Sequence, residues 1–95
     1  MYENLWKIIE HYGINNQQRK LEEEVFELQE AITKYEVKKS MKRKPTLKEI
    51  EEELADVTVL LNEFLVYYNL DLDKIYDICD SKIERQLKRI DSENE

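Results

Sequence analysis

Apolar residues recur along this chain at intervals of three and four, which is the period of an α-helix and not of a β-strand. The clearest stripe consists of Leu21, Val25, Leu28, Ile32 and Tyr35. Similar spacing predicts further helices over about 2–12, 46–68 and 71–90. Four amphipathic helices joined by short connections are typical of an antiparallel helical bundle. The pattern therefore predicts an all-α fold of the four-helix-bundle type.

Local sequence signals place the ends of these helices. The only glycine, Gly13, is expected to stop the first helix, and Asn15 or Asn16 to cap the second. The third helix has a T-x-x-E capping box, and the fourth has an acidic cap. These two signals consist of Thr46 with Glu49, just after the only proline, and of Asp71. Residues 91–95 are polar, and we expect them to be frayed.

A basic segment separates the second and third predicted helices. Residues 38–44 contain five Lys or Arg and no acidic residue, and Pro45 follows them. Because proline cannot sit inside a helix, we interpret this segment as a connecting loop. Two roles stay open for it, a solvated linker or a basic flap over an anionic ligand.

The third helix carries more apolar surface than three neighbouring helices would cover. From Val57 onward it is apolar on nearly all sides, as Val59, Leu60 and Val66 illustrate. A helix of this kind is surrounded by protein. We therefore expect a homo-oligomer, either a dimer or a tetramer, in which a second copy covers part of this helix.

Length and charge limit the class of protein. A chain of 95 residues fits a single domain, 1–95, and a net charge of −7 argues against a nucleic-acid polymer as partner. The longest apolar stretch, 57–68, is interrupted by Thr58, Asn62 and Glu63, so we expect no membrane association. The N-terminus lacks the apolar core of a signal peptide, and Cys79 is the only cysteine. These features favour a cytoplasmic location.

Acidic pairs flank the predicted core stripe on two helices. Glu24 and Glu27 lie three residues apart on the second helix, and Glu53 and Asp56 repeat that spacing on the third. Residues three apart share one helix face, so the two pairs can converge if the stripes pack together. Clustered carboxylates repel one another, and a divalent cation removes that repulsion. All-oxygen ligands favour Mg²⁺, with Mn²⁺ also possible.

Acidic runs also occur on ordinary solvated helices. The chain has 22 acidic residues, so the spacing alone leaves a second interpretation open. In that alternative, the protein is a non-catalytic helical interaction or oligomerisation module, and its acidic faces point to solvent.

The order of the motifs resembles that of the MazG-like nucleotide pyrophosphohydrolases, the all-α NTP pyrophosphatase superfamily. Their signature is E-E-x-x-E on one helix followed by E-x-x-D on the next. The matching residues here are Glu23, Glu24, Glu27, Glu53 and Asp56, preceded by Gln17 and Lys20 on the face of Glu24 and Glu27. The resemblance covers roughly residues 5–90.

This resemblance implies Mg²⁺-dependent hydrolysis of a (d)NTP to a (d)NMP and pyrophosphate, in nucleotide-pool housekeeping. It implies that Glu23 or Glu24 acts in catalysis, by orienting a water or taking its proton. The expected substrate contacts are Gln17, Lys20, Lys82, Arg85, Arg89 and Trp6. Gln86 stands where relatives have Asn, which departs from the family pattern of the last helix.

Three aromatic residues are candidates for stacking on a base. They are Trp6, Tyr12 and Phe26, and each could instead belong to the core or to an oligomer contact. For Tyr12 and Phe26 the sequence favours the core.

Overall fold

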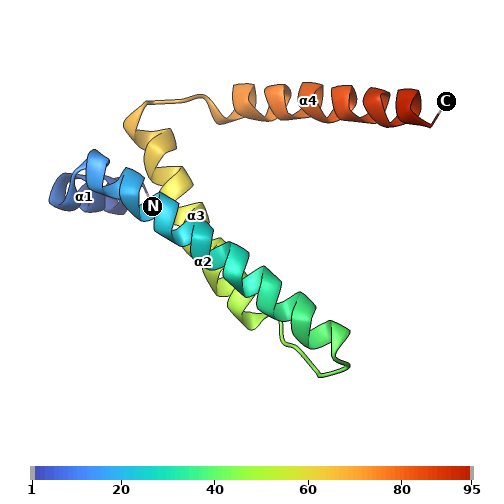
Figure 1. Ribbon diagram of the computed structural model, residues 1–95. Coiled ribbons are helices and arrows are strands. Elements are labelled where there is room, and N and C mark those ends of the chain that lie inside the picture. Colours follow the sequence, from blue (N-terminus) through green and yellow to red (C-terminus); the bar gives the residue numbers. More distant parts are fainter. Residues whose placement is uncertain (1, 95) are drawn as a thin grey trace.

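The computed structural model describes residues 2–94, and within this range the chain forms four α-helices and no strand. The helices are α1 (Tyr2–Tyr12), α2 (Ile14–Ser40), α3 (Lys48–Tyr67) and α4 (Leu72–Glu93) (Figure 1). The predicted all-α class is confirmed. No helix within this range is long and apolar enough to cross a membrane.

The core lies where the first three helices meet. α2 and α3 form a long antiparallel hairpin, and α1 packs against both of them near its open end (Figure 1). The most buried apolar side chains come from all three helices: Leu5, Ile9, Ala31, Val57 and Leu60. This arrangement fixes the facing surfaces of α2 and α3, which carry the acidic pairs.

The junction between α1 and α2 is tighter than predicted. Gly13 ends α1 as expected, with a φ of 85°, a value that glycine adopts without steric cost. The predicted caps at Asn15 and Asn16 are wrong, because α2 begins at Ile14 and both residues lie in its first turn. Asn16 instead donates from Nδ2 to the carbonyl oxygen of Tyr12, at 2.7 Å, and so ties the two helices together.

The connection between α2 and α3 lies a few residues further along the chain than the predicted loop. α2 continues to Ser40, so Lys38 and Lys39 are helical, and the Ser40 hydroxyl donates to the Val37 carbonyl. The predicted capping box is also wrong. Leu47 stands at the cap position without a side-chain hydrogen bond, and the Glu51 N–H donates to its carbonyl. The helix therefore starts too late for Thr46 to cap it.

The start of α4 agrees with the prediction, and its end does not. The Asp71 carboxylate caps the helix by accepting from the backbone N–H of Asp73, at 3.0 Å, and of Lys74, at 3.4 Å. The frayed tail predicted from residue 91 is wrong as far as Glu93, which is still helical. Glu95 lies outside the described residues.

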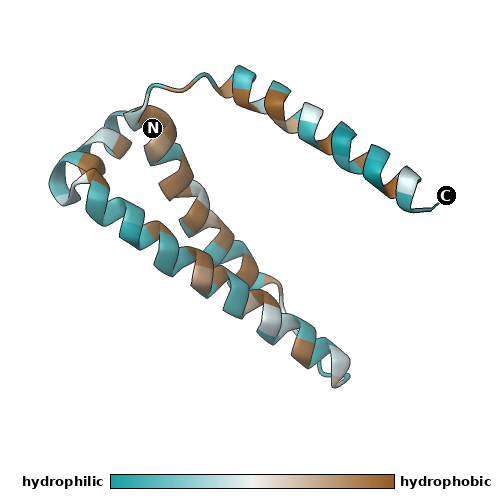
Figure 2. Ribbon diagram, turned by 45° about the horizontal axis from the view of Figure 1, so that its top comes forward, coloured by the Kyte–Doolittle hydropathy of each residue, from teal (hydrophilic) through white to brown (hydrophobic). Residues whose placement is uncertain are grey.

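α4 extends away from the other three helices (Figures 1 and 2). None of its residues is buried, although apolar side chains recur along the helix. They include Tyr76, Ile83, Leu87 and Ile90. In the protomer the bundle therefore consists of three helices. The sequence placed a fourth helix in it because the apolar period of α4 is regular, but periodicity alone does not tell whether an apolar face is buried by its own chain.

Candidate metal centre and adjoining cleft

The buried face of α2 is polar at two of its three most buried positions. Gln17, Glu24 and Ala31 are buried and lie seven residues apart, which is close to two helical turns. Val25 and Ile32, which belong to the predicted core stripe, are 38% and 43% exposed. The sequence expected the acidic residues beside the core, and the structure instead brings Glu24 onto the packed face.

Three carboxylates from α2 and α3 converge on this face. Glu24, Glu27 and Glu53 each offer one oxygen atom, and these atoms all lie within 4.8 Å of one another. Glu24 is buried, Glu53 half-buried and Glu27 exposed. Asp56 is exposed, but its charge acts on Glu53 and it lines the same cleft as Glu24. All four predicted metal ligands therefore lie in one region.

The cluster is electrostatically unfavourable as it stands. The pKa of Glu27 is raised, chiefly by its hydrogen bond to Glu24 and by the charge of that carboxylate. Desolvation, followed by repulsion from Asp56, raises the pKa of Glu53 above its ordinary value of 4.5. Within residues 2–94, the Oε2 atoms of Glu24 and Glu53 are buried without a hydrogen-bond partner. A cation would satisfy these oxygens and offset the repulsion.

The spacing and chemistry of these oxygens fit a hard divalent cation. Opposite ligands of a Mg²⁺ ion lie roughly 4 Å apart, since each bond is about 2.1 Å long. Adjacent ligands of an octahedral ion lie closer, roughly 3 Å apart, whereas the three carboxylate oxygens lie within 4.8 Å of one another. The donors are all oxygen atoms, which disfavours soft metals. Glu24, Glu27 and Glu53 can therefore share one ion after small side-chain rotations.

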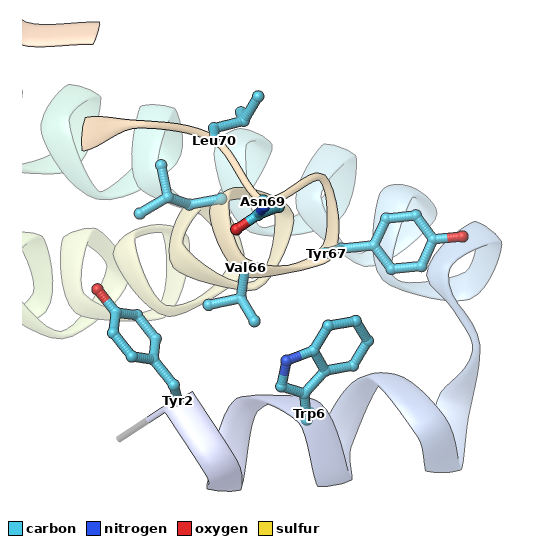
Figure 3. A pocket seen from close by; sticks show the side chains of 7 residues that line it. Tyr2, Trp6, Val66, Tyr67, Asn69 and Leu70 are labelled. Carbon is cyan, nitrogen blue, oxygen red and sulfur yellow. The ribbon is translucent and has the colours of Figure 1, made fainter. Parts of the chain in front are cut away.

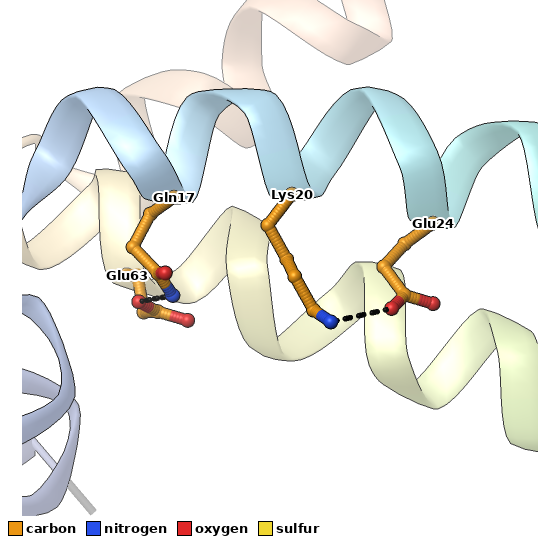
Figure 4. A network of polar contacts seen from close by, with 4 residues as sticks. All are labelled: Gln17, Lys20, Glu24 and Glu63. Atoms are coloured by element: carbon orange, nitrogen blue, oxygen red, sulfur yellow. Dashed lines mark hydrogen bonds and ion pairs between the residues drawn. The ribbon is translucent and has the colours of Figure 1, made fainter. Parts of the chain in front are cut away.

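A cleft of about 670 Å³ adjoins the cluster between α1, α2 and α3. Gln17, Lys20 and Glu24 line its α2 side, and Asp56 and Glu63 its α3 side. Figure 4 shows the α2 side chains pointing toward α3. Lys20 Nζ lies 3.5 Å from Glu24 Oε1, and Gln17 Nε2 donates to Glu63 Oε1 at 2.8 Å. Gln17 and Lys20 thus lie on the face of α2 that carries Glu24, as the sequence predicted, with Lys20 beside the cluster and Gln17 about two turns away.

Glu23 and Trp6 lie outside this cleft. Glu23 is exposed and is absent from the residues that line it. Trp6 lines a separate pocket of about 430 Å³ near the start of α1, where its ring centroid lies 6.2 Å from that of Tyr67 (Figure 3). Their predicted roles therefore rest on the resemblance and not on proximity to the cluster.

The predicted cationic contacts are not brought to the cluster within one chain. Lys82, Arg85 and Arg89 are exposed on α4, which projects away from the hairpin (Figure 1). The basic residues at 38–44 lie at the far tip of the hairpin, and Lys38 is roughly 16 Å along α2 from Glu27. Within the protomer, this segment does not cover the cluster.

Glu63 is the residue that sequence reasoning missed. Its side chain is 1% exposed, which makes it the most buried of the polar residues. The available signal was an isolated acid inside the apolar stretch 57–68. The predictions that favoured a core position for Tyr12 and Phe26 are wrong in the protomer, because these side chains are 57% and 59% exposed, and Tyr12 lines the cleft.

Comparison with known protein families agrees with the class that this fold and cluster define. Residues 8–82 match the family described as phosphoribosyl-ATP pyrophosphohydrolase. The fold and the matched family are those of the MazG-like all-α pyrophosphatases, enzymes that hydrolyse phosphoanhydride bonds. The chain belongs to the phosphoribosyl-ATP pyrophosphohydrolase family. Searches among curated proteins and solved structures gave no match. Family membership favours the enzyme over the non-catalytic module.

Proposed function

We propose that this protein is a Mg²⁺-dependent pyrophosphohydrolase that cleaves the bond between the α- and β-phosphates of a nucleotide. The products are the monophosphate of the same nucleotide and pyrophosphate. Phosphoribosyl-ATP is the first candidate substrate because the matched family carries that name, and ordinary (d)NTPs are the second. The observation that carries the proposal is the convergence of Glu24, Glu27 and Glu53, with two buried oxygens that have no hydrogen-bond partner among the described residues.

The polar groups at the acidic end of the cleft each have a role in this reaction. Glu24, Glu27, Glu53 and Asp56 hold the ion, for which Mn²⁺ can substitute. When bound, Mg²⁺ supplies positive charge to the phosphate oxygens and lowers the pKa of a coordinated water. Lys20, whose ammonium is within 3.5 Å of Glu24, binds a phosphate oxygen beside the cluster. Glu24 or the neighbouring Glu23 orients the attacking water and takes its proton.

Self-association completes the site in this proposal. The exposed apolar side chains of α4 have no cover from their own chain, and an isolated helix is only marginally stable in water. A second copy of the chain, in a dimer or a tetramer, covers this face and brings Lys82, Arg85 and Arg89 toward a neighbouring cluster. Light scattering of the purified protein tests this step, and a monomer at micromolar concentration contradicts it.

The cytoplasm is the expected location, since a reducing compartment leaves the exposed Cys79 free.

A nucleotide panel tests the activity. Phosphoribosyl-ATP and the common NTPs and dNTPs are incubated with Mg²⁺, and both pyrophosphate and orthophosphate are measured. We expect pyrophosphate from at least one substrate, and orthophosphate alone would contradict the bond assignment. Glu53→Gln and Asp56→Asn are expected to abolish turnover while the circular dichroism spectrum is retained. Glu52→Gln, an exposed neighbour on the same helix, is the matched control and stays active.

A further inference from the structure

The cleft has a second polar end that the proposed chemistry does not use. Gln17 and Glu63 lie there, each seven residues along its helix from a member of the acidic cluster, Glu24 and Asp56 respectively. Seven residues correspond to roughly 10 Å of helix. The two ends of the cleft are therefore separated by about the length that a ribose and a base occupy beyond an α-phosphate.

The polar pair at this end is buried and fixed. Glu63 is 1% exposed and Gln17 is 6% exposed, and the Gln17 amide donates to Glu63 Oε1 at 2.8 Å (Figure 4). A carboxylate has about four acceptor positions, and a neutral amide fills only one of them. Burial of such a carboxylate is unfavourable unless further donors reach it. Since Glu63 lines the cleft, a ligand in the cleft can supply such a donor.

The remaining walls suit the flat faces of a base. Ile8 and Tyr12 from α1, with Val59 and Leu60 from α3, line the rest of the cleft. Apolar and aromatic side chains of this kind pack on the π-faces of a base, while a few polar groups read its edge.

We propose that Glu63, held by Gln17, is a specificity-determining residue that selects nucleotides whose base presents an exocyclic amino group. An amino group of adenine or cytosine donates a hydrogen bond to the buried carboxylate. The carbonyl that replaces it in hypoxanthine or uracil is an acceptor facing an acceptor, so Glu63 then has no donor other than Gln17. This inference rests on the proposed function only in requiring that the cleft binds a nucleotide.

Binding of monophosphates tests the inference separately from turnover. AMP and IMP differ in the amino or carbonyl group at one position of the purine, and CMP and UMP form the equivalent pyrimidine pair. Neither pair contains a phosphoanhydride bond, so the result does not depend on catalysis. Calorimetry in millimolar Mg²⁺ is expected to show AMP binding roughly ten- to a hundredfold more tightly than IMP, the penalty of an unpaired buried acceptor. CMP is expected to exceed UMP in the same direction.

The variant Glu63→Gln separates specificity from a structural role. Glutamine keeps the shape and can still accept from Gln17, while its own amide can donate to a carbonyl. We expect the AMP-to-IMP preference to fall to within about threefold, with IMP gaining affinity, which mere loss of packing would not produce. Glu52→Gln, exposed on the same helix, should retain the wild-type preference.

Two results would overturn the inference. One is equal affinity of the wild-type protein for the members of both pairs, and the other is an unchanged preference in Glu63→Gln. If Glu63→Gln fails to fold, Glu63→Asp retracts the carboxylate by one methylene and is expected to reduce the preference several-fold. An unchanged AMP-to-IMP preference in Glu63→Asp would also overturn the inference. Absence of hydrolysis in the nucleotide panel would refute the proposed function alone.

Discussion

Replacing Glu24 with glutamine should change stability in opposite directions with and without Mg²⁺. Glu24 is 7% exposed, and its Oε2 atom has no hydrogen-bond partner within residues 2–94. Its hydrogen bond to Glu27 and its charge raise the pKa of Glu27. Without metal, Glu24→Gln removes one of three crowded negative charges, so the melting temperature should rise. With Mg²⁺ it removes a buried ligand, so the stabilisation that the ion provides should shrink.

The size of the Mg²⁺ effect follows from binding linkage. A Mg²⁺ concentration one hundred times the dissociation constant stabilises the native state by about 2.7 kcal/mol. For a domain of this size, that corresponds to a rise in melting temperature of roughly 10–20 °C. If the variant binds Mg²⁺ one hundredfold more weakly, the same concentration gives only about 0.4 kcal/mol, or roughly 2–3 °C.

Differential scanning fluorimetry in EDTA and in Mg²⁺ measures both effects, the melting temperature without metal and its shift with metal. Glu22→Gln is the matched control because Glu22 is exposed on the same helix and lies outside the cluster. A full Mg²⁺ shift in Glu24→Gln would refute its role as a ligand. A lower melting temperature of this variant in EDTA would refute the claim of crowding.

Three further perturbations test the electrostatics and the fold. The raised pKa values of Glu27 and Glu53 mean that the native state holds protons that the unfolded chain has released, so stability without metal should fall as pH rises from 4.5 through these raised values. The midpoints of urea unfolding across this pH range measure the decline in stability, and Mg²⁺ should make the decline smaller. A stability that rises with pH would contradict the raised pKa values. Asp71→Ala removes the cap of α4, so it should lower helicity near the start of the helix and the free energy of urea unfolding by about 1 kcal/mol. Asp71→Asn should keep most of the capping stabilisation. Leu60→Ala opens the three-helix core at a side chain that is 4% exposed and should cost roughly 2–5 kcal/mol; a smaller loss would show that this core is not closely packed.

The helical class could be predicted because the apolar period is regular on every helix. The stop at Gly13 and the cap at Asp71 were also readable, since each depends on a residue with a strong local preference. The expected cap at Thr46 failed for the opposite reason. Its motif is local and weak, and the geometry of the turn after α2 determines where α3 begins.

The sequence predicted which residues form the candidate site, but it did not predict how deeply they are buried. The spacing of Glu24, Glu27, Glu53 and Asp56 indicated that they could share a face, and the structure brings them together. The sequence did not indicate that Glu24 would be buried, because the helical spacing from Leu21 to Leu28 made Val25 the better core candidate. Glu63 was missed for a related reason, since only tertiary packing shows that its partner is Gln17.

The position of α4 could not be predicted from the apolar periodicity of its sequence. Its apolar stripe is as regular as those of the core helices, yet the residues that carry it are exposed in the protomer. An apolar stripe reports that a face needs a partner and does not say which chain provides that partner. The prediction that Lys82, Arg85 and Arg89 contact substrate therefore depends on association between copies.

Anomalous diffraction from crystals soaked in Mn²⁺ tests the central claim most directly, because it locates the ion without reference to activity. We predict a peak bonded to oxygens of Glu24, Glu27 and Glu53, at the point where α2 faces α3, and loss of that peak in Glu53→Gln crystals. Ordered carboxylates at these positions with no peak between them, or a peak at other residues only, would contradict the account.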